Sequence, residues 1–189
     1  MEIKLRASRI PEATFDTMRL EHFEACGENE DALKAVQEFT AGKLERPMLL
    51  LYGGPGLGKT HLAMSVAWMR ILEGKTALYW QVPDLLDALR EGYKVEDRLR
   101  PGEISMGSYS YIMGTAKNYH TLVLDDMGMQ KGTDWAIERL DSIVDYRYIN
   151  RKETIITTNT LDIPERTKDR CKDGRVVLLR GKSYRGSKK

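Results

Sequence analysis

The sequence has few cysteines and histidines and no long hydrophobic run. Cys26 and Cys171 are the two cysteines among 189 residues, and they lie far apart. The three histidines share no metal-ligand spacing, so neither a disulfide framework nor a zinc site is expected. No apolar run approaches the ~20 residues of a transmembrane helix, and the N-terminus lacks the apolar core of a signal peptide. These absences predict a cytoplasmic protein that does not contact a membrane.

The composition is that of a globular domain. Apolar residues make up 41% of the chain and charged residues 31%, which excludes a disordered or collagen-like chain. The net charge of +2 is unevenly spread, because residues 164–189 hold ten of the 30 basic residues and three of the 28 acidic ones. A basic end on a mildly acidic body indicates either a polyanionic partner or a solvated tail.

Short apolar runs alternate with longer amphipathic segments along the chain. This alternation predicts a parallel sheet covered by helices on both faces. Strands are expected at 47–52, 76–82, 121–124, 154–158 and 175–179. Helices are expected at 29–41, 59–72, from 84 to at least 91, 104–117 and 133–150, the last with Thr133 as its N-cap. Ligands of such sheets bind at the carboxyl ends of the strands.

A glycine-rich loop follows the first of these strands. The segment from Gly53 to Thr60 fits the phosphate-binding pattern GxxxxGK[ST]. Its glycines let backbone N–H groups point at an anion, and the helix that begins at Lys59 adds the positive end of its dipole. Lys59 can bind the β- and γ-phosphates, and the Thr60 hydroxyl can bind Mg²⁺. We therefore expect a nucleoside triphosphate to be held by Gly53, Gly54, Pro55, Gly56, Leu57, Gly58, Lys59, Thr60 and His61.

Polar residues also end two later strands. Asp125 and Asp126 follow the apolar run 121–124, which is typical of a Walker B motif. There the first carboxylate holds Mg²⁺ and the second orients or deprotonates the attacking water. Asp126 is one methylene shorter than glutamate, so the water must lie closer or hydrolysis is slow. Asn159 ends the strand 154–158, where it can contact the γ-phosphate as a sensor or simply form a turn.

Together these motifs resemble the AAA+ ATPases, and among them the DnaC/DnaI-type replicative helicase loaders and the related IstB transposition ATPases. The resemblance covers about residues 10–187. It rests on the segments 52–63 (YGGPGLGKTHLA), 121–128 (TLVLDDMG), 155–159 (IITTN), 164–170 (PERTKDR) and 183–185 (SYR). It implies an α/β P-loop NTPase fold of AAA+ type, with a five-stranded parallel sheet between helices. It also implies ATP and Mg²⁺ as cofactors, ATP hydrolysis in DNA replication, and a replicative helicase of DnaB type as partner.

The same resemblance implies an arginine finger, a cation that one subunit inserts into the site of the next. It assigns this role to Arg166, with Arg170 as second choice, and so implies self-association. It also places Arg185 near the nucleotide. The alternative is that the arginines of 164–170 lie on a short basic surface helix. About ten residues follow the last expected strand, so no C-terminal helical lid is expected.

Two units are expected along the chain. Residues 46–189 form the ATPase domain, and residues 1–45 form its N-terminal lead-in. Full-length loaders carry a helicase-binding domain before the ATPase core, and we expect that domain to be missing from this chain. Helicase binding is therefore implied by the resemblance and not by residues present here.

A contact with single-stranded DNA is expected between the second and third strands. AAA+ initiators and loaders carry an extra helix at this place, and residues 83–120 are long enough for two helices. Basic side chains there can bind phosphates and tyrosines can stack on bases, although nearby acidic residues dilute the charge. The candidates are Arg90, Lys94, Arg98, Arg100 and Lys117, with Tyr93, Tyr109 and Tyr111. The alternative is a solvated helix pair.

Several other functions remain open from the residues. A small P-loop nucleotide kinase would suit the length, but paired aspartates and Asn159 favour water as the nucleophile. A GTPase is disfavoured because no NKxD motif occurs. An adaptor that binds ATP without hydrolysing it remains possible because Asp126 is short. An IstB-like transposition helper would use the same chemistry on a different client.

Overall fold

Five strands form one parallel sheet in the part of the chain that the computed structural model describes, residues 7–25, 27–128 and 133–184. The strands are β1 (Met48–Tyr52), β2 (Ala77–Gln81), β3 (Thr121–Met127), β4 (Glu153–Thr158) and β5 (Arg175–Leu178). They lie in the order β2-β3-β4-β1-β5, and each neighbouring pair is parallel. The central strands are therefore β3, β4 and β1.

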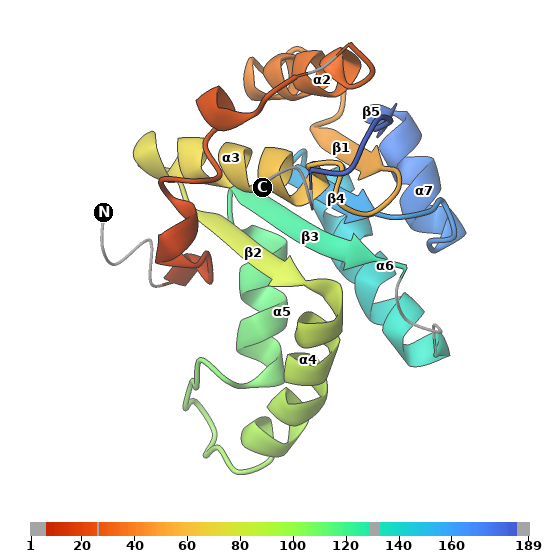
Figure 1. The fold of residues 1–189 in the computed structure, drawn as a ribbon. Helices are drawn as coiled ribbons and strands as arrows, with labels where there is room; N and C mark the ends of the chain where they lie inside the picture. The colour runs from red at the N-terminus through yellow and green to blue at the C-terminus, as the bar shows by residue number, and fades with distance from the viewer. Residues whose placement is uncertain (1–6, 26, 129–132, 185–189) are drawn as a thin grey trace.

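Helices cover both faces of this sheet (Figure 1). One face carries α2 (Glu30–Thr40) and α3 (Lys59–Leu72), together with the short turns η1 (Glu12–Thr14) and η2 (Leu20–His22). We call it the α3 face. The other face, the α6 face, carries α4 (Val82–Glu96), α5 (Tyr109–Asn118), α6 (Asp134–Ile149) and α7 (Glu165–Lys172). The α/β fold class predicted from the sequence is confirmed.

The side chains of β1 alternate between the two faces of the sheet, and both faces are buried. Leu49 and Leu51 pack into the core on the α3 face, whereas Met48 and Leu50 pack on the α6 face. All four are fully buried. Because successive side chains of a strand point to opposite faces, a strand with two covered faces must be apolar throughout. The run that predicted this strand has that character.

Most elements lie where the sequence predicts them, and α3 has the predicted bounds of 59–72. Thr133 caps α6, because its hydroxyl accepts a hydrogen bond from the Ala136 N–H. The third strand, in contrast, extends to Met127 and so includes both aspartates. The fourth expected helix was placed wrongly: α5 begins at Tyr109 and not at residue 104.

The late start of α5 has a local cause. Ser108 is its N-cap, and the serine hydroxyl accepts a hydrogen bond from the Tyr111 N–H. Such a cap satisfies an N–H group that has no partner within the helix. Ile104 and Met106, which the expected helix included, lie in the preceding loop and are 82% and 77% exposed.

The helices α4 and α5 extend below the sheet in Figure 1 and form a hairpin, which we call the α4–α5 hairpin, residues 82–118. None of the described helices is both long and apolar enough to cross a membrane.

Candidate nucleotide-binding site

Two of the four glycines in the loop between β1 and α3 stand at positions that no other residue would fit. Gly53 has a φ of 142°, and a Cβ atom there would lie 2.3 Å from the carbonyl oxygen of Leu179. Gly58 has a φ of 87°, and its Cβ would lie 2.7 Å from the ring of Phe23. Other residues are strained at such φ values and would also collide here. The glycines thus fix the loop ahead of the α3 N-terminus, where N–H groups are available for an anion.

Lys59, the first residue of α3, is 5% exposed and reaches back over the loop. Its Nζ donates to the carbonyl oxygens of Gly53 and Gly54 at 2.7 and 2.8 Å. It also donates to Oδ1 of Asn159 at 2.9 Å, at the end of β4. The lysine of the loop and the proposed sensor asparagine, 100 residues apart in the chain, are therefore in direct contact.

Asp125 lies in β3 beside the N-terminus of α3 and is 1% exposed. The Thr60 hydroxyl donates to both of its carboxylate oxygens, at 3.0 and 3.1 Å. Two residues that the sequence analysis did not select also donate to it: Tyr79 to Oδ2 at 2.7 Å and Thr157 to Oδ1 at 2.5 Å. The tips of β2, β3 and β4 and the start of α3 thus meet at one carboxylate.

Asp126 lies in a bulge. The pairing of β3 with β4 shifts register between Leu124 and Met127, and Asp126 has a φ of 54°. Its backbone N–H donates to the Thr157 hydroxyl at 3.0 Å. Without a bulge, neighbouring residues of a strand point to opposite faces. A bulge can re-aim a side chain next to a functional site, so Asp126 is not confined to the face opposite Asp125.

Thr60 and Asp125 suit a magnesium ion. Mg²⁺ prefers oxygen ligands and is held in nucleotide sites by one or two protein oxygens together with phosphates and water. The proton of the Thr60 hydroxyl is directed at Asp125, which leaves an oxygen lone pair of Thr60 free for a metal. The buried carboxylate receives hydrogen bonds from three neutral hydroxyls, and these do not offset its charge.

Other predicted nucleotide contacts lie to one side of the loop. The His61 ring contacts the N-terminal segment, with Nε2 2.8 Å from the carbonyl oxygen of Arg19 and an edge-on contact with Phe23. The Tyr184 N–H donates to the carbonyl oxygen of Gly56 at 2.9 Å. The structure therefore brings the N-terminal and C-terminal segments to the loop. Arg185 lies outside the described residues.

Arg166 and Arg170 lie on α7 and share one partner. Their Nε atoms are 2.8 and 3.1 Å from the two carboxylate oxygens of Asp145 on α6. Arg170 also packs over the Tyr148 ring, and its side chain is 31% exposed against 62% for Arg166. Both arginines thus lie on a short basic helix and are held by their own subunit in this structure.

The proposed DNA-binding residues are spread over the α4–α5 hairpin. Arg90 pairs with Asp87, and Lys94 pairs with Glu91, each at 2.8 Å. Tyr93 and Tyr109 stack on each other with ring centroids 4.2 Å apart. Each of these two rings therefore has one face covered by the other, and that face is not available for stacking on a base.

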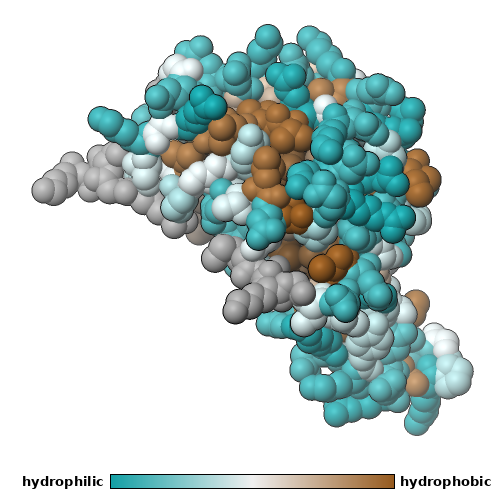
Figure 2. All heavy atoms as spheres, turned by 90° about the vertical axis from the view of Figure 1, so that its right-hand side faces the viewer, coloured by the Kyte–Doolittle hydropathy of each residue, from teal (hydrophilic) through white to brown (hydrophobic). Residues whose placement is uncertain are grey.

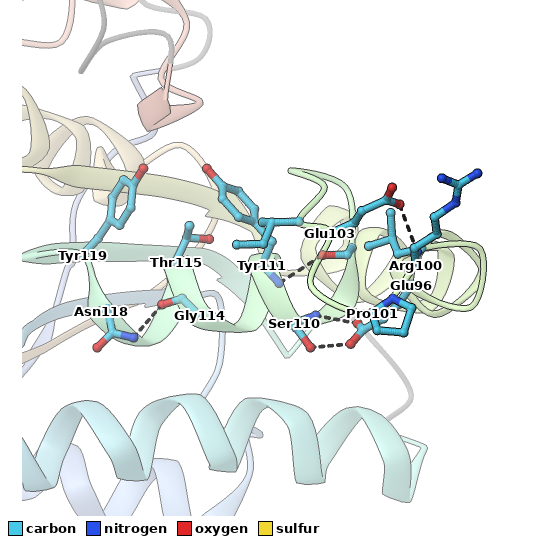
Figure 3. Close-up of a pocket in the computed structure, with 13 residues that line it drawn as sticks. Glu96, Arg100, Pro101, Glu103, Ser110, Tyr111, Gly114, Thr115, Asn118 and Tyr119 are labelled. Atoms are coloured by element: carbon cyan, nitrogen blue, oxygen red, sulfur yellow. Dashed lines mark hydrogen bonds between the residues drawn. The ribbon is translucent and has the colours of Figure 1, made fainter.

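A cavity of about 640 Å³ lies between α5 and the loop that precedes it. Arg100 and Tyr111 line it, and Figure 3 shows Tyr111, Thr115 and Tyr119 pointing to the same side of α5. The cavity belongs to the α4–α5 hairpin and not to the loop that carries Lys59.

The strands point to the right in Figure 1, so Figure 2 looks onto their carboxyl ends. Hydrophobic residues form an irregular patch in the upper half of this face that reaches down to its centre, and hydrophilic residues surround them (Figure 2).

Comparison with known proteins places these features in a family. The family of IstB-like ATP-binding proteins matches residues 2–165. The replicative helicase loader DnaC of Escherichia coli K12 is 28% identical over 141 residues, which make up 70% of this chain and 54% of that protein. The chain thus spans about half the length of this relative.

Solved structures share the fold. The crystal structure of the DnaC helicase loader has a TM-score of 0.69 at 22% identity, covering 90% of this chain and 100% of that one. The replication initiator DnaA bound to AMPPCP and single-stranded DNA has a TM-score of 0.74 at 22% identity, covering 87% of this chain and 50% of that one. The fold is that of an AAA+ P-loop NTPase, and by its sequence match the chain belongs to the family of IstB-like ATP-binding proteins.

Proposed function

We propose that this chain binds and hydrolyses ATP as the ATPase domain of a loader of a replicative DNA helicase. Residues 46–189 form that domain, with residues 1–45 as its lead-in. The similarity to DnaC supports a helicase of DnaB type as the protein that is loaded. Loading would take place in the cytoplasm.

One observation carries the proposal: the contacts that join Lys59, Thr60, Asp125 and Asn159 at one edge of the sheet. In the resting chain Lys59 is held by two carbonyl oxygens and an amide oxygen. We infer that phosphate oxygens replace these neutral partners, because the ammonium group attracts an anionic oxygen more strongly than a neutral one. The contact between Lys59 and Asn159 supports a sensor role for the asparagine beside the γ-phosphate.

The same site supports hydrolysis by an in-line attack of water on the γ-phosphorus. The bond to the oxygen that bridges the β- and γ-phosphorus atoms breaks, and ADP and phosphate leave. Asp126 orients this water and accepts its proton. Mg²⁺, held by Thr60 and by Asp125 through water, would offset the charge of the phosphates when bound.

Replacing Asp126 by asparagine tests hydrolysis. We expect single-turnover decay of bound ATP to slow roughly 100-fold or more, because positioned general bases contribute factors of that size. ATP binding should remain, since the amide keeps the shape of the side chain. Asp31→Asn, at an exposed position in the first turn of α2, is the matched control and should not change the rate.

Two outcomes of that experiment would contradict the proposal. If bound ATP decays equally slowly in wild type and Asp126→Asn, Asp126 has no catalytic role, and the chain is an ATP-binding adaptor. Decay that requires an added phosphoryl acceptor would instead indicate a kinase.

We also propose that the chain works as an oligomer through a trans arginine finger, with Arg166 as the first candidate. Its side chain is twice as exposed as that of Arg170 and is not packed over Tyr148. Asp145 also pairs with Arg170, so a neighbouring γ-phosphate could take Arg166 without leaving the Asp145 carboxylate unpaired.

Contact with single-stranded DNA through the α4–α5 hairpin is part of the proposal. Exposed ion pairs are weak, so Arg90 and Lys94 can exchange Asp87 and Glu91 for phosphates. Changing Arg90, Lys94 and Arg98 together to glutamine should weaken binding. It should also reduce the slope of log K against log salt by about 2, because each phosphate contact on a single strand contributes about 0.7.

Fluorescence anisotropy with a labelled oligonucleotide across a salt series measures this slope. The matched control removes three basic residues outside the hairpin, Lys34, Lys43 and Lys75, and should leave the slope unchanged. An unchanged slope in the hairpin variant would mean that DNA binds elsewhere or not at all.

A second candidate function is that of an IstB-like transposition helper, which the family match over residues 2–165 favours. The ATPase chemistry would be the same and the client would be a transposase. Affinity capture of the protein with a helicase or a transposase as bait separates these two clients.

A further inference from the structure

The residues around Asp125 all lie on the α3 face, for a reason visible in the strand register. Tyr79 and Val123 are register partners in β2 and β3, and both pack in the core on that face. Asp125 follows Val123 by two residues and therefore points to the same side. Thr157 follows Ile155 of that core by two residues in β4. Side chains from β2 and β4 thus flank the carboxylate beneath the start of α3.

Tyr79 and Thr157 hold different oxygens of this carboxylate. Tyr79 donates to Oδ2 from one neighbouring strand, and Thr157 donates to Oδ1 from the other. A carboxylate that accepts a hydrogen bond on each side cannot rotate without breaking one of them. Thr60 then contacts the same group from α3, at 3.0 and 3.1 Å.

Tyr79 is suited to act as a permanent donor. It is 8% exposed, and the hydrogen bond from its hydroxyl to Asp125 is buried. Burial, followed by the charge of Asp125, raises the pKa of the Tyr79 phenol well above its ordinary value of 10.0. A phenol has one O–H to donate, and Oδ2 of Asp125 accepts it at 2.7 Å.

We propose that Tyr79 is a positioning residue of the ATPase site, whose hydroxyl fixes the Asp125 carboxylate in the orientation that holds the nucleotide-bound divalent metal. This inference rests on the proposed function. Tyr79 acts through Asp125 and has no part in the attack on phosphate. Its counterpart is Thr157, which also accepts the N–H of Asp126 and so couples the two aspartates.

Tyr79→Phe removes this hydroxyl and keeps the ring. Partners that orient a metal-binding carboxylate typically change metal affinity by 10–100-fold when removed. We expect the apparent dissociation constant of Mn²⁺, in the presence of a saturating non-hydrolysable ATP analogue, to rise roughly tenfold. Electron paramagnetic resonance of free Mn²⁺ measures it without turnover. Binding of the metal-free analogue in EDTA should not change.

Hydrolysis gives a second readout. The turnover of Tyr79→Phe should be low at limiting Mg²⁺ and should return to within about twofold of wild type at saturating Mg²⁺. A variant that is merely misfolded would not be rescued by the metal. The matched control is Tyr146→Phe, which removes an exposed hydroxyl that donates to Asn118 at 3.0 Å, outside the site. It should leave the Mn²⁺ affinity unchanged.

A second pair of variants covers a failure of Tyr79→Phe to fold. Thr157→Val removes the donor on the other side of the carboxylate and should weaken Mn²⁺ binding, and Thr157→Ser should restore it. If wild type binds Mn²⁺ with the analogue and both Tyr79→Phe and Thr157→Val bind it equally well, the positioning role is wrong. If wild type itself binds no Mn²⁺ with the analogue, the proposed ATPase function fails as well.

Discussion

Replacing Lys59 by alanine is expected to weaken the binding of Mg-ATP roughly 100-fold. The lysine is the cation that reaches over the glycine-rich loop, and it would donate charge-assisted hydrogen bonds to two phosphate groups. Each such bond contributes about 1.5 to 3 kcal/mol, and a loss of ~3 kcal/mol raises the dissociation constant about 100-fold. Isothermal titration calorimetry with Mg-ATP measures this change.

The control for this variant is Lys75→Ala, which removes an exposed lysine beyond the other end of α3. Its affinity for Mg-ATP should equal that of wild type. Lys59→Ala also deprives Gly53 and Gly54 of a donor, so thermal unfolding must show that the variant is folded. Unchanged uptake of Mg-ATP by a folded Lys59→Ala protein would remove the basis of the proposed function.

The same variant tests whether the arginine finger acts between subunits. At ATP concentrations well below its raised dissociation constant, Lys59→Ala keeps Arg166 but leaves its own site empty, whereas Arg166→Ala keeps the nucleotide site but lacks the finger. Neither protein alone should hydrolyse ATP. A mixture should regain hydrolysis, because one subunit supplies the site and the other the cation. A mixture as inactive as its components would exclude Arg166 as a finger in trans.

The parts of the site that a local motif defines could be predicted from the sequence. The start of α3 follows from the glycine-rich loop, because the lysine of the motif begins the helix. The apolar runs of β1 and β3 identify strands covered on both faces. Contact between Lys59 and Asn159 follows from the rule that parallel strands bring their carboxyl ends together.

The positioning residues could not be predicted, because they depend on register between strands distant in sequence. Tyr79 looks like an ordinary core tyrosine in an apolar strand. Its place beside Asp125 emerges only when Gln81 is paired with Asp125, which puts Tyr79 one step back on the same side. A usable signal is the alternation of side chains along a strand. Once two strands are aligned, a residue two positions before a paired residue on the neighbouring strand lies on the same face. The bulge at Asp126 has no comparable signal in the sequence.

Hydrophobic patterning also misled in both directions. Ile104 and Met106 are apolar but exposed, because the turn before the Ser108 cap controls the chain there. Arg147 is charged, yet it is fully buried on the stripe of α6 that carries Leu140 and Val144. Sequence reasoning treats an arginine as a surface residue, because arginine is almost never fully buried without partners. In this position the partners come from backbone carbonyl groups.

Arg147 connects three elements through those carbonyl groups. Its Nη1 donates to the carbonyl oxygens of Ala116, Lys117 and Tyr119 at the end of α5. Its Nη2 donates to those of His120 and Glu153, and its Nε donates to the Thr154 hydroxyl. The last carbonyl groups of a helix have no partner within the helix, so this side chain caps α5 and ties it to β4.

The charge of this residue persists despite its burial. Burial lowers the pKa of the Arg147 guanidinium to about 9, and the Glu153 carboxylate opposes that shift. At pH 7 the group is therefore still protonated and can use all of its donors. The buried guanidinium is stabilised mainly by neutral carbonyl groups, and these carbonyl groups in turn rely on it as their hydrogen-bond donor.

Replacing Arg147 by leucine is therefore expected to reduce the free energy of unfolding by about 3 to 5 kcal/mol. The loss arises because several buried carbonyl groups lose their donor at once, and each costs about 1 to 3 kcal/mol when it stays unsatisfied. Against a typical total of roughly 5 to 15 kcal/mol this is a large fraction. Urea unfolding measures it, and Arg98→Leu, at an exposed position, should change the value by about 0.5 kcal/mol or less. A loss below ~1 kcal/mol in Arg147→Leu would mean that water satisfies these carbonyl groups and that α5 does not depend on the cap.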